Sequence, residues 1–397
     1  MPTALKCFGL LLVPVCLIVV TPGGLALQQS PTLSVTLAGQ SMIRCDIRVH
    51  TPSVVSTMAP MLNGDVVFTN FEAAVGELRK AQLPGNGRLL APAPPGALAS
   101  LKDLGFNLVS LADNHAWDLE IPGIQNTLKE VDRLNLAHAG TGNTLDEAAA
   151  PGYLRTPKGT VALVAMASGL IPPGGGATAA KPGVNELDVE AGNKPNEGDA
   201  QRILQSIRDA SKQADLVIVY QHNHVYTKPF HILMEEELPE RLRPPDWIKQ
   251  WAHAEVDAGA DIVVMHGAPL VQGVEVYRNR PIFYDLGNFI FQLPPSQTVA
   301  DEPIVWESVI AYVNFRGKDL QSIEFRPIVL NKLGQGQADT RDEYASNLFL
   351  ETRGLPTPAT GEKARYILER LAESSQPFGT TVDLKGDTAE VHLKGGN

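Results

Sequence analysis

The chain has 397 residues, 44% of them hydrophobic, which allows one large domain or two ordinary ones with a sizeable core. The formal net charge is -11, and this acidic balance argues against nucleic acid as a partner, because binding phosphates needs a basic face. An anionic substrate is not excluded, since a metal ion or a local basic patch can reverse the field at one site.

The first 26 residues have the features of a signal peptide. Lys6 is their single charge, residues 7–20 form an apolar run, and Gly24-Leu25-Ala26 fits cleavage after Ala26. The run is shorter than the roughly 20 residues of a transmembrane helix, and retention as an anchor is the alternative reading. We therefore expect an exported protein, periplasmic or at the cell surface. Its mature chain would keep Cys45 as its one cysteine, so no internal disulfide can form.

Strands that alternate with helices are predicted in the first half of the mature chain. Strands are expected at 33–38, 65–71, 106–111 and 137–140, and a Gly/Pro-rich connection at 79–98. A helix at 97–104 should end at Gly105, a typical C-cap. A second helix should open at Pro122, because Ile124, Leu128, Val131 and Leu134 recur at helical spacing.

Hairpins become frequent in the second half. They are predicted at 152–167, 273–284 and 309–329, with helices at 199–213 and 246–258 and strands at 214–220 and 260–266. The long loop at 168–198 is typical of a functional lid or a disordered insertion. A helix at 361–373 and a hairpin at 380–393 follow. Helix-linked strands first and antiparallel pairs later predict an α/β or α+β sandwich with mixed sheets. No dinucleotide-binding glycine motif and no P-loop occurs in the sequence.

Polar, ligand-type residues end four of the apolar strands. They are Asn70 and Glu72, Asn114 and His115, His222 and His224, and His266. In open α/β sheets the ligand site lies outside the carboxyl ends of the strands, so these residues predict one common site. His222 and His224 are one residue apart and would point to the same face of a strand. Imidazole, amide oxygen and carboxylate together suit Zn, Mn or Fe. Further candidate carboxylates are Asp46, Asp113 and Asp118.

A structural role is the alternative for each residue taken alone. A single histidine at a strand end is more often a hydrogen-bonded structural residue than a ligand. Asn70 and Asn114 could simply tie down tight turns, and Asp118 could cap the helix near Pro122. The convergence of the group is what favours function.

Several motifs, in order, resemble a known family. Asn70-Phe71-Glu72 resembles N-L-E, and residues 111–118 resemble L-A-N-N-H-A-x-D. Residues 140–148 resemble G-A-G-x-N with E-A, residues 259–264 resemble G-A-D-x-V-x, and residues 281–291 resemble P-I-x-Y-S-L-G-N-F-x-F. Over roughly residues 33–330 the chain thus resembles the CapA-type poly-γ-glutamate capsule biosynthesis proteins, of the calcineurin-like metallophosphatase superfamily.

Departures from the family pattern concern the metal ligands. Gln40 stands where the family has Asp, Tyr226 where it has Glu, and Gly267 and Pro269 where it has His. His224 is added where the family has Gly. An amide is a poorer ligand than a carboxylate, so one ion, rather than two, is expected.

The resemblance implies a four-layer α/β/β/α fold with mixed sheets over residues 33–330, followed by an extension at 331–397. It implies a role in making or processing an anionic polymer, with a metal-dependent hydrolase as the leaning and a non-catalytic accessory factor or a periplasmic phosphoesterase as alternatives. The expected partners are the polymer, or a small phosphoester or amide, and a membrane-bound synthase. The expected site residues are His115, His222 and Asn114 for catalysis, Lys181, Asn70 and Asn288 for substrate, and Glu72, His115, His222, His224 and His266 for a metal such as Mn, Zn or Fe.

Overall fold

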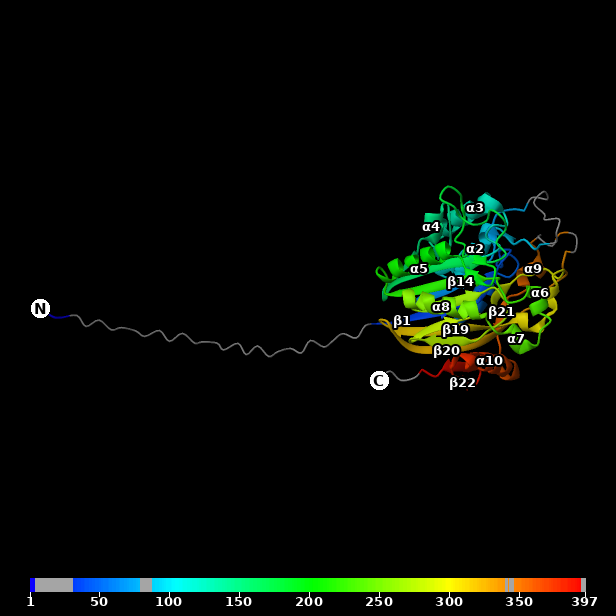
Figure 1. Ribbon diagram of the computed structural model, residues 1–397. Coiled ribbons are helices and arrows are strands. Elements are labelled where there is room, and N and C mark those ends of the chain that lie inside the picture. Colours follow the sequence, from blue (N-terminus) through cyan, green and yellow to red (C-terminus); the bar gives the residue numbers. More distant parts are fainter. Residues whose placement is uncertain (4–30, 79–87, 340–341, 343–345, 394–397) are drawn as a thin grey trace. The chain divides into compact units, whose positions relative to one another are not determined.

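Two mixed β-sheets pack face to face in the computed structural model (Figure 1). The larger has the order β22-β23-β20-β19-β1-β3-β6-β7, and β21 also pairs with β20. Its strands are β1 (Thr32–Leu37), β3 (Val66–Asn70), β6 (Leu108–Ser110), β7 (Ala137–Ala139), β19 (Glu307–Arg316), β20 (Asp319–Leu330), β21 (Pro356–Pro358), β22 (Val382–Lys385) and β23 (Thr388–Val391). The strands that carry the expected site, β3 and β6, are parallel neighbours in this sheet.

The smaller sheet has the order β16-β17-β15-β14-β10-β9. Its strands are β9 (Gly152–Thr156), β10 (Gly159–Ser168), β14 (Leu216–Asn223), β15 (Ile262–His266), β16 (Val274–Tyr277) and β17 (Arg280–Phe283). β10, β14 and β15 run parallel, and their register places His222 beside His266. Short pairs join β2 (Gln40–Met42) to β18 (Asn288–Phe291), β4 (Ala74–Val75) to β5 (Pro92–Ala93), β8 (Thr141–Gly142) to β11 (Gly183–Val184) and β12 (Val189–Glu190) to β13 (Lys194–Pro195).

Helices cover the outer faces of both sheets, except that the last one, Gly361–Ser375, packs into the core between the sheets. They are α1 (Val54–Met58), α2 (Pro95–Leu104), α3 (Glu120–Arg133), α4 (Leu145–Ala149), α5 (Glu197–Ser211), α6 (Phe230–Leu233), α7 (Leu238–Arg241), α8 (Asp246–Ala258), α9 (Leu348–Thr352) and α10 (Gly361–Ser375). α5 and α8 pack on the smaller sheet, and α1 and α2 pack on the larger one. The predicted sandwich of mixed sheets between helical layers is confirmed.

The alternation of side chains along each strand separates the three apolar cores. Phe68 of β3 and Ile218 of β14 point between the sheets, whereas Val67 and Val219 point to the outer helices. All four side chains are buried, as expected for strands covered on both faces. This alternation also fixes which residues beyond the strand ends face the space between the sheets.

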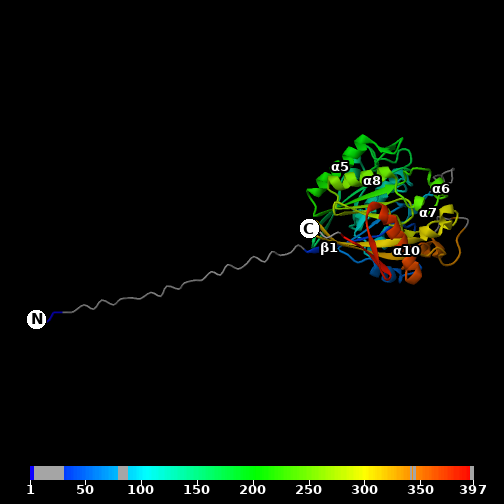
Figure 2. The same ribbon diagram turned by 60° about the horizontal axis from the view of Figure 1, so that its bottom comes forward.

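The segment after residue 330 extends the larger sheet. β21 and β23 both pair with β20, and α10 packs against β20, β22 and β16 (Figure 2). The predicted helix and hairpin are therefore present in this segment.

Two local predictions differ from the structure. The helix expected at Pro122 begins at Glu120, and the loop at 168–198 contains β11, β12 and β13. Gln40 follows the end of β1 and starts β2, which pairs with β18 because Gly39 lets the chain approach the Gly287 carbonyl. By contrast, α2 ends at Gly105 with φ 107°, as predicted.

The structure describes residues 1–3, 31–78, 88–339, 342 and 346–393, and Pro31–Asn397 forms one compact unit. Residues 4–30 lie outside the described residues, and with them most of the expected signal peptide and all of its cleavage region. Among the helices of the described part, none combines the length and apolar character needed to cross a bilayer.

Candidate metal site at the strand ends

Five of the expected site residues share one orientation because of strand alternation. Asn70 and Glu72 continue the series of β3 positions that point between the sheets, and His222 and His224 do the same for β14. His266 ends β15 in the same way. The carboxyl ends of these strands therefore direct their polar residues to one edge of the space between the two sheets.

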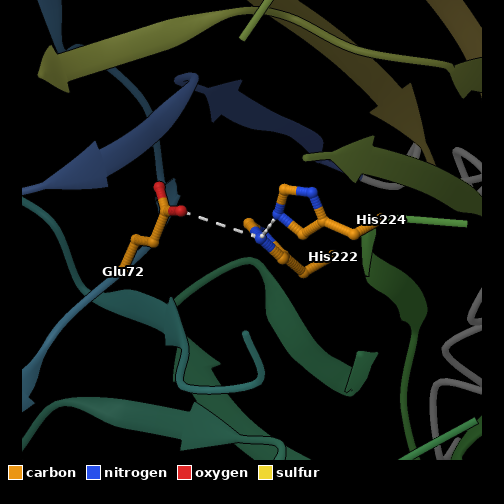
Figure 3. Close-up of side chains that lie close together, drawn as sticks. All are labelled: Glu72, His222 and His224. Carbon is orange, nitrogen blue, oxygen red and sulfur yellow. Dashed lines mark hydrogen bonds and ion pairs between the residues drawn. The ribbon is translucent and has the colours of Figure 1, made fainter. Parts of the chain in front are cut away.

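Three ligand-type atoms gather around Nε2 of His222. Nε2 of His224 lies 3.0 Å away and Oε1 of Glu72 lies 3.7 Å away (Figure 3). The Asn114 side-chain oxygen lies 2.8 Å away. One ligand atom from each of Glu72, His222 and His224 fits within a span of 4.8 Å. Two imidazole nitrogens bound to one tetrahedral zinc ion at about 2.1 Å would lie about 3.4 Å apart, close to the separation seen here. The spacing therefore fits one metal ion.

Burial drives these groups toward their neutral forms. It raises the pKa of Glu72 to about 7, and it lowers the pKa of His224 to about 3. It also holds the pKa of His222 well below its usual range, with His224 adding to the effect. Burial and then the Glu72 charge raise the pKa of Asp113 well above its usual range. Neutral histidines are the form that binds metals, and an ion would favour the ionised carboxylate.

Several buried polar atoms around the cluster have no hydrogen-bond partner. They are Oε2 of Glu72, both side-chain atoms of Asn70, Oδ2 of Asp113 and both ring nitrogens of His266. Buried polar groups are almost always paired, and each unpaired one costs about 1–3 kcal/mol. So many at one place indicate a site built for a polar ligand, and a divalent cation suits this donor set.

His115 belongs to a separate part of the site. Its Nδ1 lies 2.6 Å from Oδ2 of Asp118, and Oδ1 of Asp118 accepts a 2.8 Å hydrogen bond from Arg88. Arg88 also donates to the Asn114 carbonyl, again at 2.8 Å. Burial disfavours the charged form of His115, but the Asp118 carboxylate outweighs this and raises its pKa. His115 is thus suited to carry a proton rather than to bind a metal through Nδ1.

The remaining expected residues occupy different environments. Both ends of the Asn288 amide are engaged, since its oxygen accepts from Gln40 and its nitrogen donates to the Val305 carbonyl. Lys181 lies over the ring of Trp117, 4.9 Å from its centre, and donates to the Gly174 carbonyl. Asn70 is fully buried. His266 lies outside the group formed by Glu72, His222 and His224.

The departures from the family pattern are built into the backbone. Gly267 has φ +133°, and a Cβ there would lie 2.0 Å from the Asn223 carbonyl oxygen. A histidine cannot occupy this position without moving the chain. Gln40 donates an amide hydrogen to the side-chain oxygen of Asn288, 2.9 Å away. This hydrogen bond holds an amide at the position where the family has a carboxylate.

Two residues near the cluster were missed by sequence reasoning. Arg88 lies within the Gly/Pro-rich connection at 79–98 and gives no local signal, since its partner Asp118 is 30 residues away. Asp285, which is buried, stands where the closing motif has Ser, and that departure was a usable signal.

Comparisons with known proteins agree with the motifs. The family model described as "Bacterial capsule synthesis protein PGA_cap" matches residues 34–293. The PGA biosynthesis protein CapA of Bacillus subtilis (strain 168) is 33% identical over 196 residues, 48% of this chain and 44% of that protein. The capsule biosynthesis protein CapA of Bacillus anthracis is 28% identical over 272 residues, 66% of this chain and 61% of that protein.

Two further matches cover more of the chain at lower identity. An uncharacterized protein of Sinorhizobium fredii, y4sH, is 26% identical and covers 87% of this chain and 89% of its own length. Among solved structures, a hypothetical protein from Thermus thermophilus aligns with a TM-score of 0.44 and 12% identity, covering 74% of this chain and 98% of that one. Because the family model spans more than half of the sequence, the chain belongs to the bacterial capsule synthesis protein family PGA_cap.

Proposed function

We propose that this protein acts in the synthesis or processing of an anionic capsule polymer such as poly-γ-glutamate, as a metal-assisted hydrolase. Family membership and the names of the two Bacillus relatives support the polymer role. The gathering of ligand atoms around Nε2 of His222 carries the hydrolase role. An exported protein, in the periplasm or at the cell surface beside a membrane-bound synthase, would meet such a polymer.

Glu72, His222 and His224 would hold the ion, with the Asn114 oxygen as a fourth ligand. The unpaired Oε2 of Glu72 and the neutral state of both histidines fit a divalent cation such as Mn, Zn or Fe. A bound divalent ion would polarise a carbonyl or phosphoryl oxygen and lower the pKa of a coordinated water.

The chain's own residues would orient the substrate and move protons. His115, whose protonated form is favoured by Asp118, would protonate the leaving group of an amide or phosphoester. Arg88 fixes Asp118 and the Asn114 carbonyl, so the proton donor and the Asn114 ligand are held by one guanidinium group. Asn70, whose amide has no protein partner, would hydrogen-bond the substrate or a bound water.

The test combines metal analysis with polymer cleavage. The purified protein and the variants His222→Ala and His115→Ala are incubated with Mn²⁺ and poly-γ-glutamate, and polymer length and bound metal are measured. We expect His222→Ala to lose both metal and cleavage, and His115→Ala to keep the metal but cleave at least roughly 100-fold more slowly. His392→Ala, at an exposed histidine, is the matched control. Wild-type levels of metal and cleavage in His222→Ala would contradict the proposal.

A non-catalytic accessory role is the second candidate, and the ligand positions lost at Gln40 and Gly267 favour it. It predicts that the wild-type protein binds the polymer without shortening it. Release of phosphate from a panel of phosphoesters, with no polymer cleavage, would instead identify a phosphoesterase.

A further inference from the structure

A tyrosine stands on either side of the histidine pair at the metal site. Tyr220, His222, His224 and Tyr226 alternate along the chain, each one residue from the next. The Nε2 atoms of the two histidines face each other at 3.0 Å (Figure 3). Nδ1 of His222 lies 3.3 Å from the Tyr220 hydroxyl oxygen. Nδ1 of His224 lies 3.5 Å from the Tyr226 hydroxyl oxygen. Each histidine thus has one ring nitrogen at the site and the other at a tyrosine.

The hydroxyl of Tyr226 determines where His224 carries its proton. This hydroxyl donates its one hydrogen to the Asn223 carbonyl at 3.0 Å, so toward Nδ1 of His224 it can only accept. Because burial depresses the pKa of His224, the ring is neutral and carries a single proton. That proton lies on Nδ1, where Tyr226 accepts it, and Nε2 keeps its lone pair for a cation.

His222 carries its proton on the opposite nitrogen in the arrangement described. Its Nε2 faces two acceptors, the Asn114 side-chain oxygen at 2.8 Å and the bare Nε2 of His224 at 3.0 Å, so it donates. Its Nδ1 then accepts from the Tyr220 hydroxyl. A cation bound through Nε2 of His222 needs this proton on Nδ1 instead. Tyr220 permits the change, because a hydroxyl can either donate to a bare nitrogen or accept from an N–H group.

Two departures from the family pattern are explained together by these contacts. His224 stands where the family has Gly, and Tyr226 stands where it has Glu. A histidine that binds a metal through Nε2 usually donates its Nδ1 proton to an oxygen, which fixes the ring and its tautomer. The added histidine at 224 therefore needs an acceptor, and Tyr226 places one beside it.

We propose that Tyr220 and Tyr226 are positioning residues that accept the Nδ1 protons of His222 and His224 and so direct both Nε2 lone pairs to one cation. The inference rests on the proposed function, because it concerns the same ion. On binding, the His222 ring would give up its Nε2 proton and take one on Nδ1, so it would release no net proton. The Tyr220 hydroxyl would turn from donor to acceptor.

The experiment locates the ring protons, with Zn²⁺ as the probe ion. Full-length protein with ¹⁵N-labelled histidines is treated with chelator and then titrated with Zn²⁺, and two-bond proton–nitrogen spectra report which ring nitrogen carries the proton. His222→Ala and His224→Ala assign the signals. In the chelator-treated wild type we expect the proton on Nδ1 of His224 and on Nε2 of His222. With Zn²⁺ we expect it on Nδ1 of both rings.

Two variants remove the hydroxyl groups one at a time. Tyr226→Phe should let His224 carry its proton on either nitrogen, and Tyr220→Phe should leave the His222 Nδ1 proton without an acceptor in the Zn²⁺-bound protein. Zn²⁺ affinity, measured by competition with a chromophoric chelator, should fall about 10–100-fold in each. Tyr312→Phe is the control, since its hydroxyl donates to the Met61 carbonyl outside the larger sheet. It should change neither readout, and circular dichroism checks the fold of every variant.

The outcomes separate this inference from the proposed function. Wild-type Zn²⁺ affinity in both tyrosine variants would overturn the inference and leave the proposed function standing. A proton on Nε2 of His224 in the chelator-treated wild type would do the same. Weaker binding in one variant alone would keep the role of that tyrosine and overturn the role of the other. No Zn²⁺ binding by the wild type, or binding that His222→Ala leaves unchanged, would overturn both.

Discussion

Two buried carboxylates in this protein have opposite surroundings. Glu307, at the start of β19, binds Lys363 at 2.8 Å through one oxygen and Arg370 at 2.5 Å through the other. Glu72 faces two neutral histidines, and its second oxygen has no partner. Both side chains are almost fully buried. Elsewhere in this fold, a buried carboxylate with a structural role is therefore paired with cations. The lack of such pairing at Glu72 indicates a functional role rather than a structural one.

The largest effect on stability is expected at Glu307, where both carboxylate oxygens are paired with cations. Arg370→Ala would leave Glu307 buried with one cation fewer and should lower the free energy of unfolding by about 3–5 kcal/mol, measured by urea at pH 7. Metal content should not change. Arg365→Ala, at an exposed pair on the same helix, is the control and should have little effect. A loss no larger than the control's would mean that the Glu307 pairing is not structural.

Replacing Glu72 should change the free energy of unfolding in the opposite direction. Its folded-state pKa of about 7 lies above the usual 4.5, so ionisation opposes folding as pH rises through this window. At pH 8, in chelator-treated protein, Glu72→Gln should therefore raise the free energy of unfolding by about 3 kcal/mol. Glu351→Gln should lower it instead, because Glu351 is buried but paired with His50. Destabilisation by both variants would remove the contrast between paired and unpaired carboxylates.

Among the three titratable ligands Glu72, His222 and His224, only Glu72 should make the metal affinity depend on pH. Below about pH 7 the ion must displace the Glu72 proton, so affinity should fall about tenfold per unit from pH 7 to pH 5. His224 is neutral down to about pH 3, and the pKa of His222 is also depressed, so neither adds to this slope. Titration calorimetry with Mn²⁺ measures it. A slope that persists in Glu72→Gln would assign the proton to another group.

The smallest effect on stability is expected in the 168–198 segment. Lys181→Ala removes a cation–π contact with Trp117 and should lower stability by about 0.5–1 kcal/mol. If Lys181 also contacts the polymer, polymer binding should weaken several-fold. Lys194→Ala, at an exposed lysine of β13, is the matched control. Equal polymer affinity in the two variants would limit Lys181 to holding the 168–198 segment against Trp117.

The strand ends were predictable because strand period and polarity are local properties. His222 and His224, one residue apart, had to share a face, and Glu72 follows the β3 alternation. The roles of Arg88 and Asp285 were not predictable, because they come from contacts between distant parts of the chain. Asp118 could be read as a helix cap from its position, whereas its carboxylate in fact joins His115 to Arg88. Local sequence patterns thus predict the strands and the faces of their residues, whereas contacts between polar residues depend on how distant segments pack.

The backbone contact at Gly267 makes the divergence from the family hard to reverse. With the Asn223 carbonyl 2.0 Å from any Cβ at this position, a return to histidine is blocked until the β14 end has moved. A Gly267→His substitution would therefore disturb the end of β14 before its ring could act as a ligand, so sterics alone keep a histidine from this position.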